Sequence, residues 1–112
     1  MELEPVNTRI QETVSEELYH KLVAQIDKDF ILTGIQYDFN SLKPNELIVC
    51  LNEIMEELLN KEYPVLLSLL YRMDIPESAI DFGDEETVEL QLVNLILRRQ
   101  FMKVKMRENF KL

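Results

Sequence analysis

Apolar residues recur at helical spacing along most of the chain. In the first third they return every four positions, which places side chains on one face of a helix. These positions are Ile10, Val14, Leu18, Leu22, Ile26 and Phe30. The pattern predicts a first helix from about Asn7 or Thr8 to residue 30. Because a strict four-residue step drifts around a helix, a kink or a restart capped by Ser15 is the alternative.

Two further helices are indicated in the middle of the chain. Asn40, Ser41 and Pro44 are typical of a helix start. The apolar positions that follow cover an arc of about 140° on a helix. They are Leu47, Ile48, Leu51, Ile54, Met55, Leu58 and Leu59. Pro64 breaks this pattern, because the residue before a proline is pushed out of the helical region. Residues 64–73 are then apolar nearly all round, which predicts a deeply buried helix.

Residues 30–39 give the least clear pattern. Their apolar positions fit a short strand, but no convincing partner strand occurs elsewhere, and a lone strand is not stable. Gly34 also weakens a helix at this point. We therefore interpret the segment as the end of a helix followed by an apolar loop that packs on the core.

The last third of the chain predicts one long helix. A short helical turn over residues 77–82 should stop at Gly83, and Asp84 should cap the helix that follows. Acidic residues then come first and basic residues last, which suits the helix dipole. The continuous polar positions of this helix are Gln91, Asn94, Arg98 and Lys105.

Together the patterns predict an all-α fold, a compact bundle of four to five helices with a long C-terminal helix. Residues 1–7 would be a flexible N-terminal tail and residues 8–112 a single helical domain.

Composition narrows the chemistry. The chain has 112 residues, with one Cys, one His and two Gly. That excludes a disulfide scaffold, a zinc site built from Cys and His, and a glycine-rich phosphate loop, so we expect no metal and no cofactor. The N-terminus lacks the apolar stretch of a secretory signal, and no apolar run approaches the roughly 20 residues of a membrane span. A soluble, cytoplasmic protein is expected.

Charge is distributed unevenly. The chain carries 12 Lys and Arg against 21 Asp and Glu, a net charge of −9. The last fifteen residues reverse this balance, with six basic side chains and only Glu108 as an acid. An acidic body should repel nucleic acid and anionic lipid, whereas the basic end should attract them.

Two stretches carry a resemblance. The segments LLYRMDIPE (Leu69–Glu77) and LILRRQFMKVKMRENF (Leu95–Phe110) are similar to small, uncharacterised helical proteins from Bacteroidetes. The shared pattern is LLYRxD with a following Glu, then an apolar helix that ends in RQxxKxxxR. That resemblance covers the C-terminal half and implies an all-helical fold. It implies no activity.

Few residues suggest catalysis. Glu17 and His20 have the E-x-x-H spacing of di-iron helix bundles, but such a site needs a second histidine. Cys50 and His20 would make a nucleophile and base only with an orienting partner, which the sequence does not identify. The glutamates around residues 53–57 and 85–89 are better explained as solvated faces and helix starts. We expect no catalytic residues.

Arg72 follows a nearly apolar run, so its long side chain should extend its charge to the surface or pair with a carboxylate. We predict a structural ion-pair cluster of Arg72, Asp74 and Glu77 that holds the turn after this helix. An anion-binding role for Arg72 is the alternative.

The basic C-terminal end admits three interpretations. It can simply complement the helix dipole, dock on another protein, or contact nucleic acid or a membrane surface. We favour a non-enzymatic interaction or assembly module, a homodimer or a partner of another protein, and keep a nucleic-acid-binding regulator as the alternative. The predicted partner-binding residues are Arg98, Arg99, Phe101, Met102, Lys103, Lys105, Arg107 and Phe110.

Overall fold

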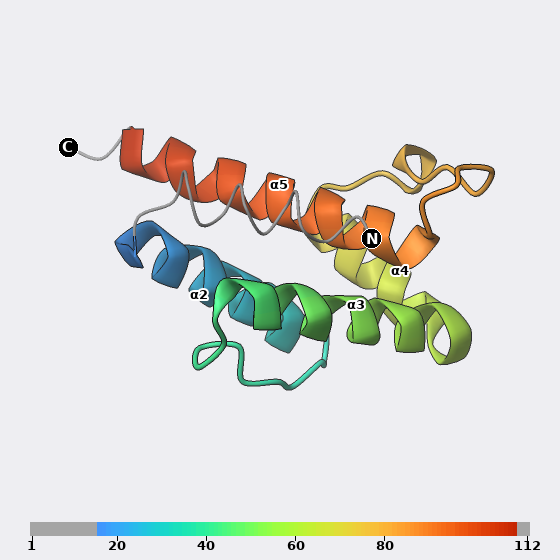
Figure 1. Ribbon diagram of the computed structural model, residues 1–112, viewed down its shortest axis with the longest axis horizontal. Coiled ribbons are helices and arrows are strands. Elements are labelled where there is room, and N and C mark those ends of the chain that lie inside the picture. Colours follow the sequence, from blue (N-terminus) through green and yellow to red (C-terminus); the bar gives the residue numbers. More distant parts are fainter. Residues whose placement is uncertain (1–15, 110–112) are drawn as a thin grey trace.

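The computed structural model describes residues 16–109, and most of that range is helical (Figure 1). The helices are α2 (Glu16–Leu32), α3 (Pro44–Lys61), α4 (Tyr63–Arg72) and α5 (Val88–Asn109), with a short 3-10 helix, η1, over Glu77–Ala79. The described part contains no strand, so the predicted all-α bundle with a long C-terminal helix is confirmed. The tail over residues 1–7 and the expected helix start near residue 8 lie outside the described residues.

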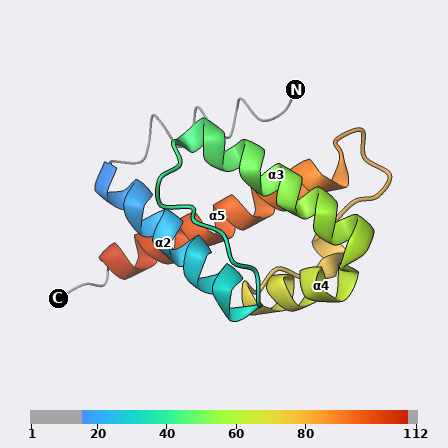
Figure 2. The ribbon, with the colours of Figure 1, turned by 90° about the horizontal axis from the view of Figure 1, so that it is seen from below.

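Helix α5 is the central contact of the bundle. It packs against both α2 and α3, while α4 packs beside α3 and touches α2. Figure 1 shows α5 along one side of the molecule, and Figure 2 shows α2 and α3 crossing it from the opposite side. The apolar faces of the helices meet between these layers. The largest fully buried side chains there are Leu22, Ile26, Phe30, Phe39, Leu47, Ile48, Leu51, Met55, Leu66, Leu69, Leu70 and Met73.

The segment after α2 is a loop that packs on the core, as the sequence predicts. Helix α2 ends because Gly34 adopts a φ of 89°, and the Ile35 N–H donates to the Phe30 carbonyl at 2.9 Å. This ending needs a residue in the left-handed region, which glycine occupies without steric cost. Further along, Phe39 is fully buried, and its ring lies 5.2 Å from that of Phe30 in an edge-to-face arrangement.

The prediction that α4 is deeply buried is wrong. Leu66, Leu69 and Leu70 are buried, but Leu67 is exposed and Tyr71 is 86% exposed. The reason is that α4 packs on α3 and α2 along one face only. Its apolar outer residues therefore remain on the surface of the described part of the chain.

The predicted cap of the last helix is also wrong. The Thr87 hydroxyl oxygen accepts a hydrogen bond from the Leu90 N–H at 3.2 Å, so α5 begins after Thr87 rather than after Asp84. Asp84 instead accepts from the Glu86 N–H within the preceding loop. Gln91 fixes this loop: its Oε1 accepts from the Asp81 N–H at 2.8 Å. Its Nε2 donates to two carbonyls of the same loop.

A half-buried tyrosine joins α2 to the loop before α3. The Tyr19 hydroxyl donates to the Leu42 carbonyl at 2.7 Å. Burial, together with the negative charge of Glu46, raises the pKa of Tyr19 from 10.0 to about 12. Because the folded pKa lies above the unfolded one, Tyr19 contributes stability below pH 10 and loses it as the pH rises towards 12.

Tyr19→Phe is therefore expected to cost about 1 kcal/mol of unfolding free energy at neutral pH, through loss of that hydrogen bond. The deficit should shrink between pH 10 and pH 12, because the variant has no hydroxyl to ionise. Urea denaturation of the wild-type and Tyr19→Phe proteins at several pH values measures this difference in unfolding free energy. Tyr71→Phe, which alters a hydroxyl with no partner among residues 16–109, is the control and should match wild type. A pH-independent deficit in Tyr19→Phe would contradict the prediction.

Candidate functional site

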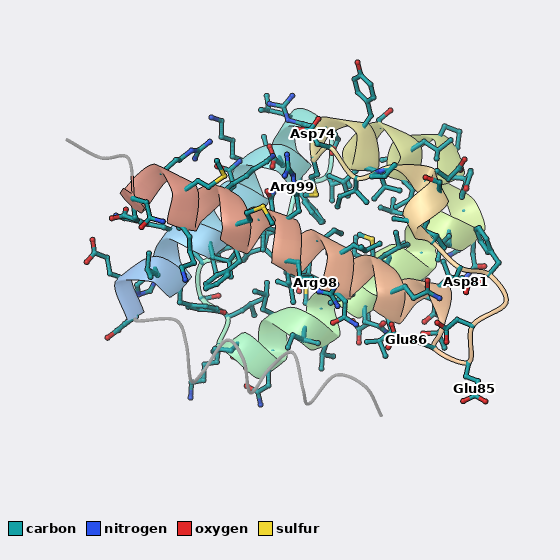
Figure 3. The ribbon with its side chains drawn as sticks, turned by 90° about the horizontal axis from the view of Figure 1, so that it is seen from above. Asp74, Asp81, Glu85, Glu86, Arg98 and Arg99 are labelled. Carbon is teal, nitrogen blue, oxygen red and sulfur yellow. The ribbon has the colours of Figure 1, made fainter. Side chains whose placement is uncertain are left out.

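The basic residues of α5 point in three directions. Arg98 and Lys105 are exposed, and the Arg99 guanidinium reaches towards Asp74 (Figure 3). Lys103 turns instead towards α2. The structure therefore separates the basic residues that the sequence places together. Phe110, the last predicted partner-binding residue, lies outside the described residues.

A buried carboxylate collects side chains from three helices. Asp29 of α2 is only 3% exposed. Its Oδ2 accepts from the Nε2 atoms of Gln25, at 3.1 Å, and of Gln100, at 2.5 Å. Its Oδ1 accepts from Arg72 Nε at 3.2 Å, and Lys103 Nζ lies 3.9 Å from Oδ2. Burying a carboxylate is costly unless it is paired and hydrogen-bonded, and this one is both.

Arg107 extends this cluster towards the surface. Its Nη1 donates to Gln25 Oε1 at 2.6 Å, which orients the amide so that its nitrogen faces Asp29. Gln100 is completely buried, and its Oε1 has no partner within residues 16–109. Its contact with Asp29 is therefore the hydrogen bond that sets the orientation of this amide. We call these six residues the Asp29 cluster: Gln25, Asp29, Arg72, Gln100, Lys103 and Arg107.

The sequence contains a signal for this cluster. Asp29 lies seven residues after Leu22, so it falls within the apolar face of α2. Gln100 likewise lies four residues after the buried Ile96. A polar residue inside an apolar stripe indicates a buried hydrogen-bond network when several helices contribute one.

The ion pairs around the turn after α4 differ from the predicted ones. Arg72 bonds to Asp29 rather than to Asp74 or Glu77, because side chains on a helix point back along it. Arg99 holds the turn instead: its Nε donates to the Met73 carbonyl at 3.2 Å. Its Nη2 donates to Asp74 Oδ2 at 3.3 Å, where Asp74 has a φ of 60°. Glu77 accepts from the hydroxyl of a tyrosine at the start of α4.

The outward side of α5 carries exposed apolar surface. Met102 and Met106, one turn apart, are 50% and 52% exposed. A shallow apolar groove of about 180 Å³ lies beside Met102, between α5 and the turn at residues 74–79. Phe101, by contrast, packs partly on the core, with Lys105 Nζ 5.4 Å from its ring centre. We call the following residues the outer face of α5: Leu95, Arg98, Met102, Lys105 and Met106.

The candidate metal-ligating and catalytic residues from the sequence have ordinary structural surroundings. Glu17 pairs with Lys21 at 3.3 Å, and His20 lies 3.8 Å from Glu16. Within residues 16–109, no three His, Cys, Asp or Glu side chains gather where they would hold a metal ion. Burial raises the pKa of the Cys50 thiol, which keeps it in the less nucleophilic protonated form. None of the helices in this range has the length and apolarity needed to cross a membrane.

Comparisons with protein-family models, with curated proteins and with solved structures found no match to this chain. The similarity to the Bacteroidetes family therefore stays a prediction.

Proposed function

We propose that this protein is a non-enzymatic protein–protein interaction module that docks through the outer face of α5. The observation that carries the proposal is the half-exposed pair Met102 and Met106, of which Met102 also lines an apolar groove. Single exposed apolar residues are ordinary on protein surfaces, but a contiguous set next to a groove is typical of a docking surface. Methionine side chains adapt readily to the shape of a partner.

The partner that fits this face best is a second copy of the chain. The loop before α5 carries Glu85 and Glu86 (Figure 3), whereas Lys105 lies near the C-terminal end of α5. Two α5 helices packed antiparallel would set the acidic start of each beside the basic end of the other. Such pairing is the usual twofold arrangement of a homodimer, and the charges would fix its direction. With one cysteine and so no disulfide within the chain, we place this dimer in the cytoplasm.

Size-exclusion chromatography with light scattering tests the proposal. We expect the wild-type protein to be a dimer and the double variant Met102→Asp/Met106→Asp to be a monomer. Both methionines are half exposed, so the variant should keep its fold, which circular dichroism would verify. Val49→Asp is the matched control, because Val49 is 48% exposed on α3 and lies outside the proposed interface.

Two results would overturn the dimer: a monomeric wild-type protein, or a double variant that stays dimeric. Absorbance at 260 nm and 280 nm should be followed in the same experiment. Since the chain has no Trp and only 4 Tyr, bound nucleic acid would be obvious. Nucleic acid that stays bound at moderate salt would favour the alternative function, a regulator that contacts nucleic acid through the C-terminal helix.

A further inference from the structure

A polar cleft opens between α2, α4 and α5, above the Asp29 cluster. Its volume is about 590 Å³, within the range of sites that hold small organic ligands. Polar and charged side chains from all three helices line the cleft. They include Lys28, Asp29, Ser68, Tyr71, Arg72, Lys103 and Arg107.

Positive charge exceeds negative charge in this cleft. Four cationic side chains line it, and the acids among its lining are Asp29 and Asp74. Asp74 is already paired with Arg99, and Asp29 is buried below the surface. The chain as a whole carries a net charge of −9, so the cleft is a local region of opposite sign. A concave region of this kind concentrates anions.

The cationic groups also have hydrogen-bonding capacity left over. Arg72 uses its Nε for Asp29, which leaves both terminal nitrogens without a partner in the described range. Lys103 Nζ stands 3.9 Å from Asp29, beyond hydrogen-bond distance. Arg107 uses Nη1 alone, and Lys28 is exposed with no ion pair inside residues 16–109. The three hydrogen bonds that the Asp29 oxygens accept come from Gln25, Gln100 and Arg72 Nε, and none comes from these remaining donor atoms.

Hydroxyl groups add to the same set of donors. Ser68 and Tyr71 line the cleft on α4, and neither side chain has a partner among the described residues. Tyr71 is 86% exposed, which is unusual for a large aromatic ring at the end of an otherwise apolar helix. Its ring is available at the edge of the cleft for stacking on a flat group.

We propose that this cleft binds the phosphate group of a small phosphorylated molecule. A phosphate offers several acceptor oxygens and about two negative charges, which match converging arginine and lysine donors. The cations would contact the phosphate, and the Tyr71 ring would pack against the remainder of the molecule. The site is separate from the outer face of α5, so it stands or falls independently of the proposed dimer.

Isothermal titration with pyrophosphate at low ionic strength tests the site. We expect the wild-type protein to bind pyrophosphate with a Kd below about 1 mM, and Lys28→Gln/Arg107→Gln to bind at least about tenfold more weakly. Both substituted residues are exposed, so the fold should be retained, as thermal unfolding would verify. Lys105→Gln is the control, because it removes a positive charge from α5 outside the cleft. This control should bind like wild type.

Titrations with adenosine monophosphate and inorganic phosphate show whether the ligand is a phosphorylated ring compound or free phosphate. If Tyr71→Ala weakens adenosine monophosphate but not inorganic phosphate, the ligand carries a ring. If both probes bind equally and Tyr71→Ala changes neither, the ligand is free phosphate. The cleft is disproved if pyrophosphate fails to bind at 1 mM, or if Lys105→Gln weakens it as much as the double variant does. Tighter, strongly salt-dependent binding of a single-stranded oligonucleotide would replace the small ligand with nucleic acid.

Discussion

Asp29→Ala is expected to lower the free energy of unfolding by about 1–3 kcal/mol, because it leaves hydrogen-bond donors around a buried carboxylate without their acceptor. Asp29 is 3% exposed and satisfies Gln25, Gln100 and Arg72 at once. Without it, the fully buried Gln100 amide loses its hydrogen bond, and two cations lose their shared counter-charge. Chemical denaturation followed by circular dichroism measures the change.

Two comparison variants separate charge from packing. Asp29→Asn keeps the shape and one acceptor oxygen, so its loss should be smaller than that of Asp29→Ala. Asp27→Ala removes a carboxylate two positions earlier on α2 that has no ion pair within residues 16–109. Because Asp27 is half-buried and its carboxylate has no ion pair in this range, the loss should stay within about 0.5 kcal/mol. A loss below 1 kcal/mol in Asp29→Ala would show that the Asp29 cluster is not required for stability.

Phe39→Ala is expected to destabilise the protein by about 3–5 kcal/mol, the usual cost of removing a buried aromatic ring. Phe39 is fully buried although it belongs to a loop, and its ring packs edge-to-face on Phe30. Truncation would leave a cavity in the core and release the loop between α2 and α3. Denaturation by urea, followed by circular dichroism, gives the difference.

Phe82→Ala is the matched control, since Phe82 is also a loop phenylalanine but is 66% exposed. We expect it to change the unfolding free energy by no more than about 0.5 kcal/mol. Equal losses in the two variants would mean that Phe39 does not anchor its loop. Phe39→Leu should fall between them, because leucine fills part of the space.

The elements predicted best are those whose evidence is local. Helix α3 begins at Pro44, as expected, and the Lys43 N–H donates to the Glu46 carboxylate at 2.8 Å to complete its start. The apolar loop around Phe39 was also predicted, because Gly34 and the lack of a partner strand are visible in the chain itself. Spacing, prolines and glycines act over a few residues, so a sequence displays them directly.

The errors arose where a distant segment decides the outcome. An apolar run does not reveal how many of its sides will be covered, and α4 is covered along one face only. Asp84 and Thr87 are both good caps, and the choice between them depends on Gln91, which draws the loop at Asp81 against α5. Gln91 was assigned to a polar stripe but is buried in this contact.

Helical periodicity and the distribution of charge are enough to predict a helical bundle with a long last helix and an acidic body with a basic end. Which of the basic groups come together depends on the packing of the helices. Arg72 meets Asp29 from 43 residues away and Gln100 meets it from 71. These long-range contacts depend on how each helix is rotated about its axis and where it crosses its neighbours. Helical periodicity fixes which residues share a face, whereas packing between helices fixes what that face touches.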